Sequence, residues 1–215
     1  MHINYIKEKD GTHSVFVVIN NFLNKEEIIK YHSILENEND WKGGTFFGNG
    51  MPRLQKWFQD DNKYFSKNWH VQTHERWMSQ QSDEWLINLR KKIQDKIDEV
   101  FKSEINNKFN GCNYPNVNSS LINYYRDGND YIRFHKDDET VFGDNPTISM
   151  ITFGVERELK FKRIDNSELN ESYIIKSGSM FMMLGSVQKH YIHGIDRDIN
   201  IRDSRYSLTF REHKC

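Results

Sequence analysis

The chain has 215 residues, of which 36% are hydrophobic and 13% aromatic, and this is enough apolar material for one globular domain with a sizeable core. Its 30 basic and 31 acidic residues give a formal net charge of -1, so a surface for nucleic acid must be a local patch and not a global positive field. Cys112 and Cys215 are too few for a disulfide framework. We expect a soluble cytoplasmic or nuclear protein, because the sequence shows no signal peptide and no apolar run of membrane-spanning length.

The first 115 residues are predicted to contain a strand followed by two helices. Residues 15–19 form a short apolar run that is typical of a buried strand. Asn24 then stands where a helix N-cap is expected, with acidic residues in the following turn. Between residues 82 and 109, apolar side chains recur at steps of three and four, which predicts a second, longer helix. The periodic positions are Leu86, Leu89, Ile93, Ile97 and Val100.

Beyond Pro115 the helical periodicity gives way to short apolar or alternating segments separated by Gly, Asp and Asn. The predicted strands are residues 119–125, 147–153, 158–163, 172–176, 179–184, 190–193 and 205–211. So many short strands in about 100 residues favour a mainly β, closed or double-sheet architecture such as a jelly roll, with the N-terminal helices packed outside it.

The segment "IRFHKDDE" places His135 and Asp137 two residues apart at a strand or strand end. Alternation along a strand turns both side chains to the same side and Lys136 to the other. An imidazole nitrogen and a carboxylate oxygen suit Fe(II), Mn(II) or Zn(II), but a third ligand is required. The alternative reading of the pair is ordinary polar residues at the surface.

The third ligand is expected in "QKHYIHGI", where His190 and His193 are three residues apart and therefore face opposite sides of a strand. Gly194 lets the backbone turn beside a crowded centre, which favours His193, with His190 as the alternative. Two histidines and one carboxylate form the facial triad of non-haem Fe(II) oxygenases, which leaves coordination positions open. A zinc hydrolase, with three ligands and a water, is the competing metal site.

An anchor for an acidic cosubstrate is suggested by "RYSLTFR", in which two arginines share one strand face. That face carries Arg205, Ser207, Thr209 and Arg211, and the opposite face carries Tyr206, Leu208 and Phe210. A guanidinium matches a carboxylate with two parallel hydrogen bonds, although a solvated arginine at a strand end is the simpler alternative. Roughly 20 Å separates the two arginines along an ideal strand. Either the strand curves, or one arginine binds the distal carboxylate while the other serves the metal side.

The ordered set of motifs resembles the AlkB-type 2-oxoglutarate and Fe(II)-dependent dioxygenases, which repair alkylated bases. The motifs are "FFGNGMPRLQ", "NYYRDGNDYIRFHKDDE", "PTISMITFG", "RELKFK", "HYIHG" and "RYSLTFR". The resemblance implies a double-stranded β-helix in a single domain over residues 1–215, with helices and a nucleic-acid recognition segment in 1–115 and the catalytic core in 116–215. It also implies that Fe(II) is held by His135, Asp137 and His193, that 2-oxoglutarate is bound by Asn123, Tyr125, Arg205 and Arg211, and that O2 is the oxidant.

The same resemblance implies a monomeric oxidative demethylase of 1-methyladenine and 3-methylcytosine in DNA, releasing formaldehyde, succinate and CO2. It places Asp138, Glu139 and Arg157 around a flipped base and Phe47 at the position of a duplex wedge; each also has a plainer reading, as a solvated acidic turn, a surface charge or a core aromatic. RNA is the alternative partner, and an inactive nucleic-acid-binding module or a hydroxylase of another substrate are the alternative functions. Phosphate contacts are expected from basic clusters, namely Arg53 with Lys56, residues 160–163 and residues 90–92.

Overall fold

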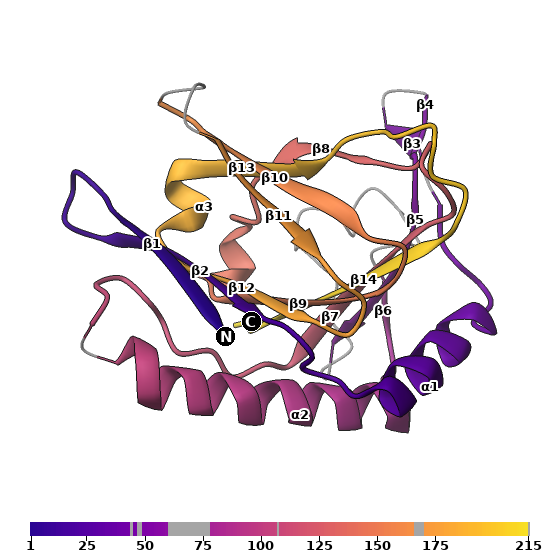
Figure 1. The fold of residues 1–215 in the computed structure, drawn as a ribbon, viewed down its shortest axis with the longest axis horizontal. Helices are drawn as coiled ribbons and strands as arrows, with labels where there is room; N and C mark the ends of the chain where they lie inside the picture. Colours follow the sequence, from indigo (N-terminus) through magenta and orange to yellow (C-terminus); the bar gives the residue numbers. More distant parts are fainter. Residues whose placement is uncertain (44, 47–48, 60–77, 107, 166–169, 215) are drawn as a thin grey trace.

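The computed structural model describes residues 1–43, 45–46, 49–59, 78–106, 108–165 and 170–214, and the chain there forms three layers (Figure 1). Two helices cover one face of a large sheet, and a smaller sheet faces it on the other side. The large sheet contains, in spatial order, β1 (His2–Lys7), β2 (His13–Ile19), β12 (Met180–Gly185), β9 (Ile148–Gly154), β14 (Arg205–Arg211), β7 (Ser119–Tyr125), β5 (Leu54–Gln59) and β6 (Ser79–Gln80). The smaller sheet contains β11 (Asn170–Ile175), β10 (Arg157–Arg163), β13 (Tyr191–Ile195) and β8 (Ile132–His135). Two facing sheets with this antiparallel pairing form the expected jelly roll.

The remaining elements are short apart from the two covering helices. They are α1 (Lys25–Glu36), α2 (Glu84–Val100), a π-helical turn (Phe101–Ile105), a 3₁₀ turn (Thr140–Phe142), α3 (Val187–His190) and the hairpin of β3 (Thr45–Phe46) and β4 (Asn49–Gly50). The expected N-cap of α1 is confirmed, because the Asn24 side chain accepts a hydrogen bond from the Glu27 amide and the Glu27 carboxylate accepts one from the Asn24 amide.

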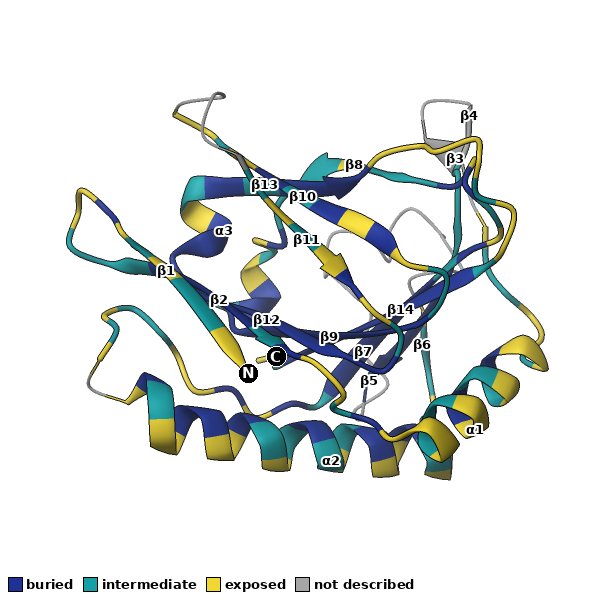
Figure 2. Cartoon of the chain, in the orientation of Figure 1, coloured by how far each residue is buried: buried dark blue, intermediate teal, exposed yellow. Residues whose placement is uncertain are grey.

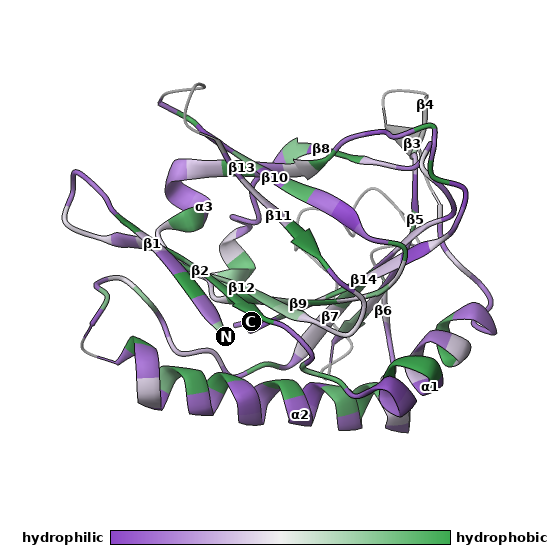
Figure 3. Ribbon diagram, viewed as in Figure 1, coloured by the Kyte–Doolittle hydropathy of each residue, from purple (hydrophilic) through white to green (hydrophobic). Residues whose placement is uncertain are grey.

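The outer core lies between the helices and the large sheet. The periodic residues of α2 form its buried stripe, while charged residues face solvent (Figures 2 and 3). They pack with Tyr206, Leu208 and Phe210 of β14 and with apolar residues of β2, β9 and β12. The helices thus pack outside the jelly roll, as the sequence predicts.

The inner core lies between the two sheets and surrounds a cavity. Phe16, Met150 and Phe181 of the large sheet contact Leu159 and Phe161 of the smaller sheet in one buried cluster. Arg205, Ser207, Thr209 and Arg211 of β14 are all buried on this side. The alternation of β14 therefore gives one strand an apolar outer face and a polar inner face.

Strands β1 and β5 are not predicted from the sequence, and the polar residues of β5 explain why that strand was missed. Its residues from 55 to 59 are buried, yet they include Gln55, Lys56 and Gln59. Lys56 is buried because its ammonium lies 3.2 Å from the Glu38 carboxylate and 5.4 Å from the centre of the Trp41 ring. The expected phosphate contact from Lys56 is therefore wrong, since that charge is already paired in the interior.

Candidate metal and cosubstrate site

A cavity of about 490 Å³ opens between the two sheets and collects most of the candidate residues. Its polar wall includes Asn123 and Tyr125 of β7, Arg211 of β14, and the cluster of His135, Asp137 and His193. The apolar wall is formed by Met51, Tyr131, Phe134, Leu159, Met183 and Ile195, among others. The size falls within the range of small-molecule sites, which are about 300–1,000 Å³.

Two neighbouring strands of the smaller sheet bring the predicted metal ligands together. His135 at the end of β8 pairs in register with His193 in β13, and Asp137 follows two residues beyond β8. The Nε2 atoms of His135 and His193 lie 3.5 and 3.6 Å from the two carboxylate oxygens of Asp137. One ligand atom from each residue lies within 4.8 Å of the others, so a single divalent ion can contact all three.

The protonation of these groups suits metal binding. The Nδ1 atom of His135 lies 2.9 Å from the Arg133 carbonyl, which can only accept, so Nδ1 carries the proton and Nε2 keeps its lone pair. Burial, assisted by the charge of His135, lowers the pKa of His193 to about 3, and the ring is neutral at pH 7. Burial alone would raise the pKa of Asp137, but the charge of Arg211 is the largest of the effects that outweigh it and hold that pKa below its usual range.

The two inner-face arginines of β14 stand in different surroundings. The Arg211 guanidinium donates to the Asp137 carboxylate, with 2.8 Å between Nη2 and Oδ2, and so serves the metal side. Arg205 is completely buried, and none of its guanidinium nitrogens has a hydrogen-bond partner among the described residues. Burial lowers its pKa to about 10 although the interaction with the Tyr125 hydroxyl opposes the shift, and the group remains charged at pH 7. A buried cation without an anionic partner is costly, which indicates that an anion belongs beside it.

Asn123 and Tyr125 complete the polar wall next to Arg205. In the pairing of β7 with β14, Tyr125 lies opposite Arg205, and the guanidinium carbon is 5.2 Å from the centre of the Tyr125 ring. The Asn123 carbonyl oxygen accepts hydrogen bonds from Arg53 Nε at 2.9 Å and Gln55 Nε2 at 2.8 Å. Asn123 lines the cavity, and because its oxygen is occupied it can act on a ligand there through its N–H donors.

Of the four predicted base contacts, the described structure brings Glu139 to the cavity. One carboxylate oxygen of Glu139 is buried without a hydrogen-bond partner in the described chain, and burial and the charge of Asp137 raise its pKa to about 7. Asp138 is exposed and pairs with Lys136 at 2.7 Å. Arg157 is buried and donates to the main-chain carbonyls of Asp130 and Asp196, so it ties two loops together. Phe47 lies outside the described residues.

His190, the alternative third ligand, lies away from the triad. It ends α3 instead of belonging to a strand, so the alternation argument does not apply to it. Its Nε2 atom is 3.6 Å from the Asp10 carboxylate in the β1–β2 turn. His193 is therefore the histidine that meets His135 and Asp137.

Several residues of the site carry no signal in the sequence. Arg53, expected at phosphate, instead holds Asn123, and burial lowers its pKa. Gln55 shares that role, and Gln188 holds the Asp137 backbone. Such contacts join segments 51–70 residues apart in the chain, and no local spacing predicts them.

The other expected phosphate clusters are largely neutralised. Lys160 pairs with Asp196 at 2.9 Å, and Arg163 pairs with Glu8 and Asp165, each at 2.8 Å. Lys92 pairs with Glu27. A phosphate at these places would have to compete with a carboxylate.

Two imidazoles and one carboxylate on a jelly roll, beside a buried cation, are the ligand set of a non-haem Fe(II) site. A model of the 2OG-Fe(II) oxygenase superfamily matches residues 15–211, and the chain belongs to that superfamily. The residues present fit the implied Fe(II) and 2-oxoglutarate, because the triad offers three ligand atoms and Arg205 lacks an anion.

Relatives confirm the resemblance to AlkB-type proteins. The chain is 29% identical over 116 residues to DNA oxidative demethylase ALKBH2 of Arabidopsis thaliana, a match that covers 44% of this chain and 37% of that protein. It is 31% identical over 102 residues to alpha-ketoglutarate-dependent dioxygenase alkB homolog 3 of Rattus norvegicus, covering 44% and 35%. The matches thus span little more than a third of these relatives.

A solved structure supports the fold. The structure of OsALKBH1 superposes with a TM-score of 0.66 over 99% of this chain and 100% of that one, at 14% identity. At this identity the likeness shows the shared jelly roll. Within the described residues, none of the helices is both long and apolar enough to cross a membrane.

Proposed function

We propose that this protein is an oxidative demethylase of alkylated bases in DNA that uses Fe(II), O2 and 2-oxoglutarate. The observation that carries the proposal is the triad of His135, Asp137 and His193 in the cavity wall, together with the fully buried Arg205 against Tyr125 of the same cavity. The site thus offers a metal-binding set and a place for a carboxylate. The names of the relatives, a DNA oxidative demethylase and an alpha-ketoglutarate-dependent dioxygenase, support the reaction.

In this proposal His135, Asp137 and His193 hold Fe(II), which together with 2-oxoglutarate and O2 supplies the hydroxylating chemistry when bound. Arg205 receives the distal carboxylate of 2-oxoglutarate, and the Tyr125 hydroxyl and Asn123 amide donate hydrogen bonds beside it. Arg53 and Gln55 orient that amide by occupying its oxygen. Arg211 holds the Asp137 carboxylate in its ionised form.

The apolar wall and Glu139 form the proposed base pocket. A base must leave its stack to reach the cavity, at a cost of a few kcal/mol that is least for a damaged or unpaired base. Tyr131 and Phe134 offer aromatic surfaces to a planar ring. The Glu139 carboxyl can accept from an exocyclic amine and attracts the positive charge of 1-methyladenine or 3-methylcytosine.

The test is an incubation of oligonucleotides that each carry one methylated base with Fe(II), ascorbate and 2-oxoglutarate. Mass spectrometry of the released nucleosides should show loss of the methyl group, with one succinate formed for each methyl lost. His193→Ala serves as the matched control and should do neither. Single- and double-stranded DNA and RNA are compared side by side, and faster turnover of RNA would reassign the partner.

Failure would take two distinguishable forms. Succinate formation that never depends on nucleic acid would favour a hydroxylase of another substrate. Binding of nucleic acid without any succinate, in metal-loaded protein, would favour an inactive binding module. Either result contradicts the demethylase.

A further inference from the structure

We propose that Gln188 is a positioning residue of the metal site, which holds the main chain of Asp137 to the segment that carries His193. This inference rests on the proposed metal site and adds a residue to its supporting shell. It concerns how the only carboxylate ligand of the three is kept in place.

The contact is direct and buried. The amide of Asp137 donates to Oε1 of Gln188 at 2.8 Å, and the two residues are 5% and 2% exposed. The other end of the Gln188 side chain points Nε2 at the sulfur of Met183, 3.5 Å away in β12. The Gln188 amide is thereby held at both ends, with its oxygen directed at Asp137.

Asp137 needs such a partner because strand pairing has ended before it. Strand β8 stops at His135, so the Asp137 amide lies beyond the ladder that aligns His135 with His193. The Arg211 guanidinium holds the Asp137 side chain, but that ion pair does not fix the position of the Asp137 main chain. A single side chain in α3 therefore supplies the hydrogen bond that a further strand residue would have supplied.

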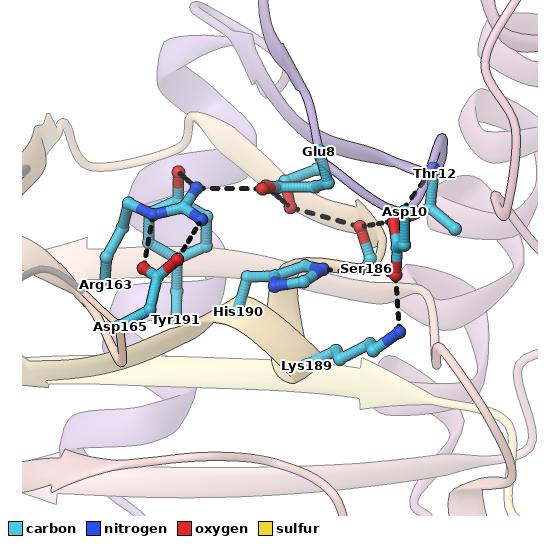
Figure 4. A network of polar contacts seen from close by, with 10 residues as sticks. Glu8, Asp10, Thr12, Arg163, Asp165, Ser186, Lys189, His190 and Tyr191 are labelled. Carbon is cyan, nitrogen blue, oxygen red and sulfur yellow. Dashed lines mark hydrogen bonds and ion pairs between the residues drawn. The ribbon is translucent and has the colours of Figure 1, made fainter.

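The short helix α3 is itself firmly anchored, which makes it a suitable support. Gly185 precedes it with φ +66, and a Cβ there would lie 2.0 Å from the His13 carbonyl, so the chain passes against the start of β2. The Ser186 amide donates to that same carbonyl at 2.9 Å. The Ser186 hydroxyl contacts the hydroxyl of Thr12 at 2.9 Å (Figure 4).

A polar network extends this anchor to the beginning of β13. The Ser14 hydroxyl, 3.3 Å from that of Ser186, donates to Glu8 at 2.6 Å, and the other Glu8 oxygen accepts from Arg163 at 2.8 Å. Arg163 also donates to the hydroxyl of Tyr191, the first residue of β13, at 3.2 Å (Figure 4). The network thus braces both ends of the segment from residue 186 to residue 191.

The segment from Gln188 to His193 thus connects two proposed metal ligands, through a side-chain contact at one end and a strand residue at the other. His193 lies five residues after Gln188, in the strand that α3 enters directly. Gln188 reaches across to Asp137, 51 residues away in the chain. Residues that orient metal ligands in this way typically change metal affinity by about 10- to 100-fold when they are replaced.

The test measures metal affinity, independently of nucleic acid and of turnover. Co(II) is titrated into metal-free protein in competition with a chromogenic chelator, with and without 2-oxoglutarate. Gln188→Met removes the acceptor and keeps an unbranched chain, and Gln188→Glu keeps an acceptor oxygen. Lys189→Met is the matched control, because Lys189 is the exposed next residue of α3 and pairs with Asp10 at the surface.

We expect Gln188→Met to bind Co(II) at least about tenfold more weakly, with Gln188→Glu and Lys189→Met within about threefold of the parent. Amide hydrogen exchange of Asp137, followed by NMR in the metal-free proteins, should be faster in Gln188→Met and unchanged in Gln188→Glu. Parent-like Co(II) affinity of Gln188→Met would overturn the inference, as would equal loss in the Met and Glu variants. If Gln188→Met does not fold, Gln188→Glu carries the test, and a loss beyond tenfold there overturns the inference.

This design separates the inference from the proposed function. A parent protein that does not bind Co(II) contradicts the metal site itself. A parent that binds Co(II), together with an unaffected Gln188→Met, contradicts only the positioning role.

Discussion

Strand β14 has two faces that are equally buried and differ in what surrounds them. On the outer face Tyr206, Leu208 and Phe210 pack against the helices in an apolar core. On the inner face Arg211 lines the cavity and has the Asp137 carboxylate, whereas Arg205 is buried against the Tyr125 ring without a charged partner in the described chain. Burial on the outer face therefore stabilises the fold, whereas burial on the inner face carries an electrostatic cost that the proposed acidic cosubstrate would relieve.

The largest effect is expected from removing the Asp137 carboxylate, the partner of Arg211 on the inner face of β14. Asp137→Ala should abolish turnover, a loss of at least about a thousandfold, because two imidazoles hold Fe(II) weakly and Arg211 loses its partner. Succinate release in the presence of methylated DNA measures the effect. The control is Asp95→Ala on the exposed side of α2, which should keep full activity. Retention of more than a tenth of the activity in Asp137→Ala would place the site elsewhere.

A substitution on the outer face of β14 should lower the stability of the fold and leave the affinity for 2-oxoglutarate nearly unchanged. Leu208 is fully buried among the residues that the helices cover, so Leu208→Ala should lower the free energy of unfolding by about 2–5 kcal/mol. Urea unfolding followed by circular dichroism measures the loss. The affinity for 2-oxoglutarate, measured where the variant remains folded, should stay within about twofold. A tenfold change in that affinity would mean that the two faces are coupled.

A substitution on the inner face should weaken 2-oxoglutarate binding and leave the stability of the ligand-free protein equal or higher. Arg205→Met removes the proposed partner of the distal carboxylate and should weaken 2-oxoglutarate binding by about 1.5–3 kcal/mol, roughly ten- to a hundredfold. In metal-free protein without ligand, the same change replaces an unpaired buried cation by an apolar side chain, so the free energy of unfolding should stay equal or rise. Titration calorimetry and urea unfolding give the two values. A clear fall in stability with unchanged binding would show that Arg205 is structural.

The smallest effect is expected for Glu139, the proposed contact to the positive charge of the methylated base. Glu139→Gln keeps the shape of the side chain and removes its charge, so at pH 8, above the raised pKa of about 7, it should lower turnover of cationic 3-methylcytosine by roughly fivefold, or about 1 kcal/mol. Turnover of a neutral methylated base should change less. Competition between the two lesions in one reaction measures the ratio. An equal loss for both would assign Glu139 to a role other than charge recognition.

Much of this molecule follows from short-range periodicity in the sequence. The steps of three and four residues in α2 and the alternation in β14 each specify which side chains are buried together, because helix and strand geometry repeat locally. The capping box at Asn24 is equally local. The pair of His135 and Asp137 is also local, since the two residues are two positions apart, although Asp137 lies past the strand end and not within it.

The tertiary structure decided which charged and polar residues were available to the site. Arg157 and Lys56 look like surface cations in the sequence, yet distant carbonyls and Glu38 keep them buried, while Asp138 stays at the surface beside Glu139. Gln188 likewise acquires its role only when α3 is folded against β2. The physical reason is that a local pattern specifies the face of an element, whereas the partner that compensates a buried polar group comes from a remote part of the chain.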